Sequence, residues 1–110
     1  MTDLTPVESQ FAAYNARDVD QFVACYSPDV VVEDGRGSTL MQGRDSMPAE
    51  YEPFFAECPD LRAEILNRIA AGDYVIDEER IHGWQADPVR AVAIYHVANG
   101  LIDHVRLIDG

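Results

Sequence analysis

Residues 14–43 read YNARDVDQFVACYSPDVVVEDGRGSTLMQG, and the rest of the chain is arranged around this stretch. Its pattern predicts the end of one helix, a second short helix, a strand over Val30–Glu33 and a glycine-rich turn over residues 34–38. A carboxylate at the end of an apolar strand is costly unless it faces water or has a function. Asp34 is therefore the first candidate for a functional residue.

The first of these helices begins before this stretch, and a third helix is expected after it. Thr5 can cap a helix that has Pro6 at its first position and Glu8 three residues beyond the cap. A third helix is expected over about residues 45–57, and Pro53 should kink or split it. These segments place the predicted helices in the first half of the chain.

From Leu61 onwards the hydrophobic pattern changes to a period of two, which is typical of strands. Asn99-Gly100 is a strong signal for a tight hairpin. Helices followed by successive strands predict an α+β fold, with about three helices on the concave face of a curved antiparallel sheet. Such a sheet forms a cone with a mouth. The expected long strands are 61–70, 74–84, 89–97 and 101–108.

Length and charge limit the possible functions. The chain has 110 residues, enough for a single domain over residues 1–110. Its 20 acidic and 8 basic residues give a net charge of −12, which disfavours binding to nucleic acid or an anionic membrane. The start of the chain lacks the pattern of a secretory signal, and no apolar run reaches the roughly 20 residues of a membrane span. Cys25 and Cys58 are expected to be free thiols in the cytoplasm.

The order of these segments, with YNARDVDQF…YSPDVVVEDG followed by PDLRAEILNRIAAGDYVIDEER, resembles the SnoaL-like branch of the nuclear transport factor 2-like superfamily. The resemblance runs from about Thr5 to Ile108. It implies a cone-shaped fold with a deep, mostly apolar pocket for a small apolar molecule, and a homodimer formed through the outer face of the sheet. Members include ketosteroid isomerases, polyketide cyclases, dehydratases and epoxide hydrolases, so the fold does not settle the activity.

Ketosteroid isomerases use an aspartate base together with two donors that hold the substrate oxygen. Val32-Glu33-Asp34 matches the segment that ends in their base. The positions of their two donors fall on Gln10 and Tyr95. The resemblance therefore retains the base position but not the donor pair, although the Tyr95 hydroxyl can still donate one hydrogen bond.

Each candidate residue has a functional and a structural interpretation. Asp34 is either a general base at the pocket wall or an ordinary Asp-Gly turn residue. Tyr14, Tyr26 and Tyr95 either line the pocket or are core aromatics with satisfied hydroxyls. Both interpretations of Asp34 carry similar weight, and Tyr14 and Tyr95 are the better candidates among the tyrosines.

The strand over 74–84 is unusually acidic, and acidic residues are poor strand formers. Alternation puts Glu78, Arg80, His82 and Trp84 on one face and Asp77, Glu79 and Ile81 on the other. The first face can supply a carboxylate, an imidazole and an aromatic wall to the pocket, or it can be a solvated face with salt bridges. The sequence leaves open which face points inwards. The predicted catalytic residues are Asp34, Tyr95 and Glu78, and the predicted ligand-binding residues are Tyr14, Tyr26, Arg80, His82 and Trp84.

Two functional hypotheses follow. The first is a cofactor-free isomerase, cyclase, dehydratase or hydrolase with a carboxylate base. The second is a dimeric module that binds a small molecule or a partner without transforming it. No metal site is expected, because the histidines are scattered without ligand spacing, and no cofactor motif is present.

Overall fold

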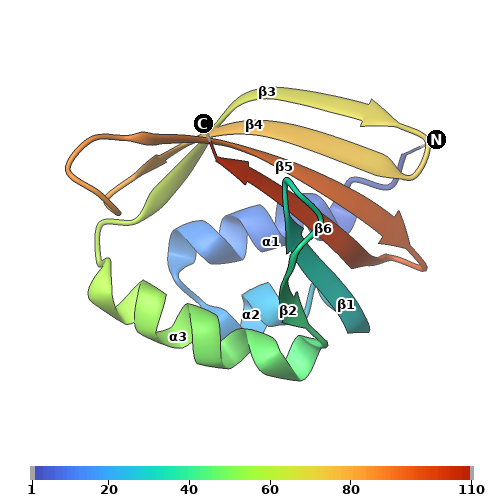
Figure 1. The fold of residues 1–110 in the computed structure, drawn as a ribbon, viewed down its shortest axis with the longest axis horizontal. Helices are drawn as coiled ribbons and strands as arrows, with labels where there is room; N and C mark the ends of the chain where they lie inside the picture. Colours follow the sequence, from blue (N-terminus) through green and yellow to red (C-terminus); the bar gives the residue numbers. More distant parts are fainter. Residues whose placement is uncertain (1, 110) are drawn as a thin grey trace.

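A curved sheet wraps around a group of helices (Figure 1). Over residues 2–109, the computed structural model has three α-helices on the concave side of one six-stranded sheet. The helices are α1 (Thr5–Ala16), α2 (Val19–Val23) and α3 (Met47–Glu57). The strands are β1 (Tyr26–Asp34), β2 (Thr39–Gln42), β3 (Arg62–Ala71), β4 (Tyr74–His82), β5 (Val89–Ala98) and β6 (Leu101–Asp109). The predicted α+β class, with helices on the concave face, is confirmed.

The strand order is β2-β1-β6-β5-β4-β3. Strands β3 to β6 form the expected antiparallel meander. The sheet is mostly antiparallel, and the exception among the described strands is β1, which runs parallel to β6 with Val32 opposite Val105. The segment containing α3 carries the chain from β2 at one edge of the sheet to β3 at the other. The chain then returns through β4 and β5, and β6 pairs with β1.

The helix ends differ in detail from the prediction. The first helix begins at Thr5 itself, whose backbone N–H donates to Asp3 Oδ1 at 3.0 Å, so Thr5 is not the capping residue. A short 3-10 turn over Arg44–Ser46 precedes α3. Pro53 lies inside α3 without splitting it. These differences shift element ends by a few residues and leave the arrangement unchanged.

An aromatic cluster joins the helices to each other. The Phe22 ring lies 4.6 Å from the Tyr51 ring, 5.8 Å from the Phe55 ring and 6.0 Å from the Tyr14 ring, measured between centroids. Phe22 and Phe55 are almost completely buried. Since aromatic pairs at these separations attract one another beyond their burial, the cluster fixes α1, α2 and α3 in relation to one another.

No helix within residues 2–109 is long and apolar enough to cross a membrane. Cys25 and Cys58 are both free thiols. Free thiols are compatible with a reducing compartment, and the cytoplasmic location stays a prediction.

Candidate functional site

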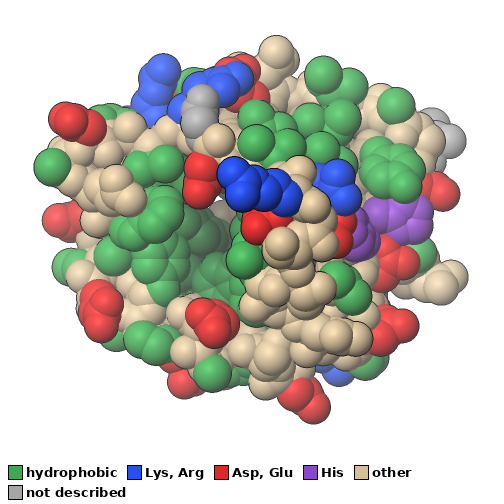
Figure 2. Space-filling view, viewed as in Figure 1, with side chains coloured by type: hydrophobic (Ala, Val, Ile, Leu, Met, Phe, Trp, Pro, Cys, Tyr) green, Lys and Arg blue, Asp and Glu red, His purple; other side chains and the backbone are tan. Residues whose placement is uncertain are grey.

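A cavity of about 360 Å³ lies between the helices and the concave face of the sheet. Figure 2 shows its mouth as a hollow walled by hydrophobic side chains. Its size falls within the range of about 300–1,000 Å³ that is usual for small-molecule sites. The aromatic and thioether side chains that line it are Phe11, Tyr14, Phe22, Tyr26, Tyr51, Phe54, Trp84, Tyr95, Met41 and Met47.

The structure decides which face of β4 points inwards. Asp77 is fully buried, and Glu79 and Ile81 line the cavity. The opposite face, with Glu78, lies on the outside of the sheet, because successive strand residues alternate. The inner face was the one that the sequence analysis left without site residues.

Three predicted site residues therefore lie on the outer face and do not line the cavity. Glu78 accepts a hydrogen bond from Arg90 at 2.9 Å. His82 Nε2 lies 3.1 Å from Glu64 Oε1, and Arg80 lies 3.9 Å from the same oxygen. These are partly exposed salt bridges, as the structural interpretation of this strand described.

Trp84 lines the cavity although alternation placed it with the outer residues. The alternation stops because β4 ends at His82, and Gly83 turns the chain with a φ of 79°. The Trp84 ring then meets Phe54 edge-on, with centroids 5.6 Å apart. A glycine at a strand end is the sequence signal that could have warned of this change.

Asp34 lies in the turn after β1, and its side chain does not line the cavity. Its Oδ1 accepts hydrogen bonds from the backbone N–H groups of Arg36 at 2.9 Å and Ser38 at 3.0 Å. This is the behaviour of a turn-forming aspartate. The physical reason is local, since two backbone N–H groups of its own turn satisfy the carboxylate.

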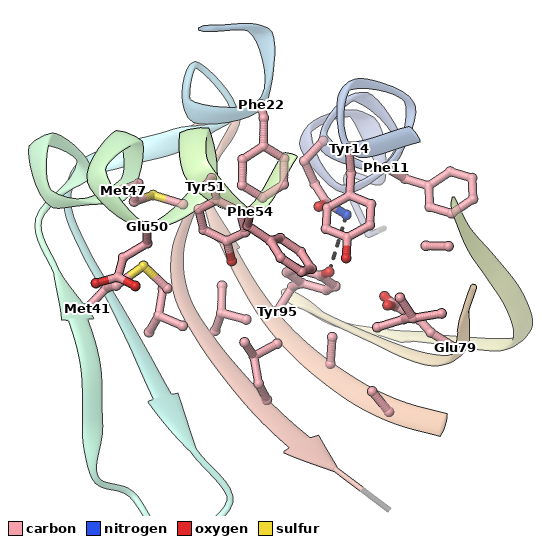
Figure 3. A pocket seen from close by; sticks show the side chains of 18 of the residues that line it. Phe11, Tyr14, Phe22, Met41, Met47, Glu50, Tyr51, Phe54, Glu79 and Tyr95 are labelled. Atoms are coloured by element: carbon pink, nitrogen blue, oxygen red, sulfur yellow. Dashed lines mark hydrogen bonds between the residues drawn. The ribbon is translucent and has the colours of Figure 1, made fainter. Parts of the chain in front are cut away.

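The two positions that correspond to the donor pair of ketosteroid isomerases are bonded to each other. Gln10 Nε2 donates to Tyr95 Oη at 3.2 Å and to the Val7 carbonyl at 2.9 Å. Tyr26 Oη donates to Gln10 Oε1 at 3.3 Å. The predicted residues Tyr26 and Tyr95 thus line the cavity as members of one buried network. Figure 3 shows the bond between Gln10 and Tyr95 at the cavity wall.

Glu79 is the functional candidate that the sequence analysis did not select. Its carboxylate faces the cavity beneath α1 (Figure 3). The pKa of Glu79 is raised to about 7, chiefly by burial and then by the nearby Asp77, with Arg68 and a hydrogen bond from Tyr95 opposing the rise. The signal available in the sequence was an acidic residue on the same face as Val75 and Ile81.

The buried neighbour Asp77 forms a salt bridge, whereas Glu79 does not. Arg68 donates to both carboxylate oxygens of Asp77, at 2.6 and 2.9 Å. Among the residues described, Glu79 forms no salt bridge, and the cavity lining contains no arginine, lysine or histidine. The described part of the chain has no group of three or more potential metal ligands. The polar groups of the cavity lining are therefore tyrosine hydroxyls, carboxylates, the Gln10 amide and the Trp84 indole.

Comparison with solved structures places this architecture among nuclear transport factor 2-like folds. An uncharacterised cystatin fold protein from Novosphingobium aromaticivorans is 27% identical, with a TM-score of 0.89 over 98% of each chain. A "putative polyketide cyclase" from Sinorhizobium meliloti is 23% identical, with a TM-score of 0.80 over 93% of this chain and 92% of that one. A hypothetical protein from Catenulispora acidiphila with a ketosteroid isomerase-like fold, in complex with trimethylamine, is 18% identical, with a TM-score of 0.78 over 93% and 82%.

The match to a protein family identifies this chain more specifically than the similarity of fold does. The SnoaL-like domain matches residues 7–105, so this chain belongs to the SnoaL-like family. A search of curated proteins finds no match. The resemblance stated from the sequence is thereby confirmed, and the activity has to be argued from the cavity itself.

Proposed function

We propose that this protein is a cofactor-free enzyme that binds a small apolar molecule in the cavity and uses Glu79 to move a proton on it. The observation that carries the proposal is a carboxylate without a basic partner, set in an aromatic cavity. Proton removal from a carbon beside a carbonyl group is the step that isomerisation, cyclisation and dehydration of ketones share. Glu79 takes the place that the sequence analysis gave to Asp34.

The environment of Glu79 suits this role. A pKa of about 7 lies near a neutral working pH, at which a group can both accept a proton and return it. The low polarity of the walls strengthens each electrostatic interaction inside the cavity. Asp34 lacks these surroundings because its carboxylate is bonded to its own turn.

The second candidate function is a binding module that does not transform its ligand. Two findings that argue against the ketosteroid isomerase arrangement of base and donors favour this binding module. Asp34 is bonded into its turn, and Gln10 and Tyr95 are bonded to each other. A binding module needs the cavity but has no need of Glu79 as a base.

Hydrogen–deuterium exchange of 2-tetralone in heavy water separates the two candidates. Loss of the proton signal beside the carbonyl group is followed by NMR, in excess of the buffer rate. Glu79→Gln should lower the enzymatic rate by about 10²–10⁴-fold, the usual contribution of a positioned base. The matched control is Glu78→Gln, one residue away on the outer face, which should change the rate less than about twofold.

The outcomes are distinct. Binding of 2-tetralone without accelerated exchange favours the binding module. Exchange that survives in Glu79→Gln refutes the role of Glu79. Exchange that is lost in Asp34→Asn but retained in Glu79→Gln returns the base to Asp34.

We also propose that two copies associate through the outer face of the sheet. Ile69, Ile76 and Ile94 are cross-strand neighbours on β3, β4 and β5, and Ile69 is 55% exposed. A row of apolar side chains on an open sheet face is typical of an association surface. The salt bridges of Glu78 and Glu64 flank this row.

A further inference from the structure

The charged groups of the cavity lining are all acidic. Among residues 2–109, the lining includes the carboxylates of Glu50, Glu79 and Asp109 and no lysine, arginine or histidine. Arg68, on β3, donates instead to both carboxylate oxygens of the buried Asp77. An anionic ligand would therefore meet like charge in the cavity, whereas a cation would meet opposite charge.

Glu79 is the acidic member of the lining that burial affects most. Glu50 and Asp109 are exposed, whereas Glu79 is partly buried and its pKa is raised to about 7, chiefly by that burial. Its carboxylate has a hydrogen bond from Tyr95 but, within the described residues, no salt bridge. An ionised carboxylate in such surroundings is costly. A positive charge on the ligand would offset that cost.

Three aromatic rings line the cavity in a connected row. The Phe54 ring lies 5.6 Å from the Trp84 ring at an interplanar angle of 83°, and 6.4 Å from the Tyr14 ring at 55°. The rings of Phe54 and Trp84 thus stand nearly at right angles, as two adjacent walls of a box. Figure 3 shows Tyr14 and Phe54 on the helix side of the cavity and Glu79 on the sheet side. Trp84 is 41% exposed and has surface that an entering ligand can cover.

We propose that the cavity binds an organic cation, an alkylated ammonium group that lies between the Tyr14, Phe54 and Trp84 rings and the Glu79 carboxylate. The faces of aromatic rings attract cations, and tryptophan does so most strongly. An alkylated nitrogen suits this site better than a primary one, because its alkyl groups pack on the rings and it gives up fewer hydrogen bonds to water. Binding of this cation goes beyond the proposed function, since it needs no proton transfer.

Binding of phenyltrimethylammonium and of tert-butylbenzene tests the site, because the two probes share one shape and differ by a positive charge. Trp84, the single tryptophan of the chain, reports both by fluorescence. The wild-type protein should bind the cation at least about 10-fold more tightly than the neutral probe. Glu79→Gln should lower this preference by about 10-fold, and Phe54→Leu by about 3-fold. The control Glu78→Gln removes the same charge from the outer face and should change the preference less than about twofold.

The pH dependence of binding is a second readout. Phenyltrimethylammonium has no proton to lose, so any dependence arises from the protein. Protonation of Glu79 below its pKa of about 7 removes the negative charge. The affinity for the cation should therefore rise by about 5- to 10-fold between pH 5.5 and pH 8 and then level off. Binding of tert-butylbenzene should not rise, and Glu79→Gln should abolish the rise for the cation.

The other ionisable groups around Glu79 do not account for such a rise. The tyrosines keep their protons throughout this interval, because burial raises their pKa values. Asp77 is held in its salt bridge with Arg68. The ionisable groups that influence Glu79 or line the cavity with it are Asp77, Arg68, Tyr14, Tyr26, Tyr51, Tyr95, Glu50 and Asp109.

Three results would overturn the organic-cation site. The first is a wild-type protein that binds the neutral probe as tightly as the cation. The second is a preference that survives in both Glu79→Gln and Phe54→Leu, which would put the cation elsewhere on the chain. The third is an equal loss in Glu78→Gln and Glu79→Gln, which would reduce the effect to attraction by the net charge of −12.

The deuterium exchange of 2-tetralone is independent of these measurements. A preference for the cation without accelerated exchange retains the organic-cation site and refutes catalysis. Glu79-dependent exchange without a preference for the cation does the reverse.

Discussion

Replacing Glu79 by glutamine should make the folded protein more stable at neutral and higher pH. A carboxyl group whose pKa rises from the usual 4.5 to about 7 on folding binds its proton more tightly in the folded state. Stability is therefore lost as the pH rises through that interval and stays constant above it. Glutamine has the same shape and no charge, so the variant escapes this loss.

The magnitude follows from the interval between the two pKa values. At about 1.4 kcal/mol for each pH unit, the full penalty of the charged carboxylate is about 3 kcal/mol. Part of it is already present at about pH 5, because a carboxyl group in the unfolded chain is largely ionised there. Glu79 also retains some access to solvent through the cavity. The advantage of Glu79→Gln should thus grow by about 2 kcal/mol between pH 5 and pH 8.

Urea unfolding at the two pH values measures this difference, provided that the slope of the free energy against urea is the same for all variants. Glu78→Gln removes an equal charge from the outer face and corrects for the repulsion within a chain of net charge −12. An advantage that is equal at pH 5 and pH 8 would show that Glu79 is not perturbed by burial. A loss of stability at pH 8 would mean that its charge has a partner.

Three further changes test other parts of the structure. Arg68→Met should destabilise the fold by about 3–5 kcal/mol, because it leaves the buried Asp77 carboxylate unpaired; a loss below 1 kcal/mol in urea unfolding would argue against a tight pair. Gly83→Ala should lower the stability of the fold much more than Gly72→Ala. Both glycines have positive φ, but only at Gly83 would a new Cβ meet a backbone carbonyl. Similar melting temperatures for the two variants would contradict this. Ile94→Asp should convert a dimer into a monomer in light scattering, and a wild-type mass near 12.3 kDa would exclude the dimer.

The sequence by itself determined the kinds and order of the elements and the family. The alternating pattern from Leu61 onwards and the Asn99-Gly100 turn are local signals, and the meander of β3 to β6 follows them. The parallel pairing of β1 with β6 was not available from such signals, because its partners, such as Val32 and Val105, are far apart in the chain.

The candidate site was decided by tertiary structure. A period of two assigns Glu78 and Glu79 to opposite faces but does not say which face the helices cover. That choice depends on the packing of α1 and α3, and it put Glu79 in the cavity and Glu78 outside. Asp34 was the leading candidate for the base in the sequence, yet its own turn supplies its hydrogen bonds. The sequence supplies a carboxylate at each of these positions. Only the packing of the helices against the sheet takes the Glu79 carboxylate out of bulk water.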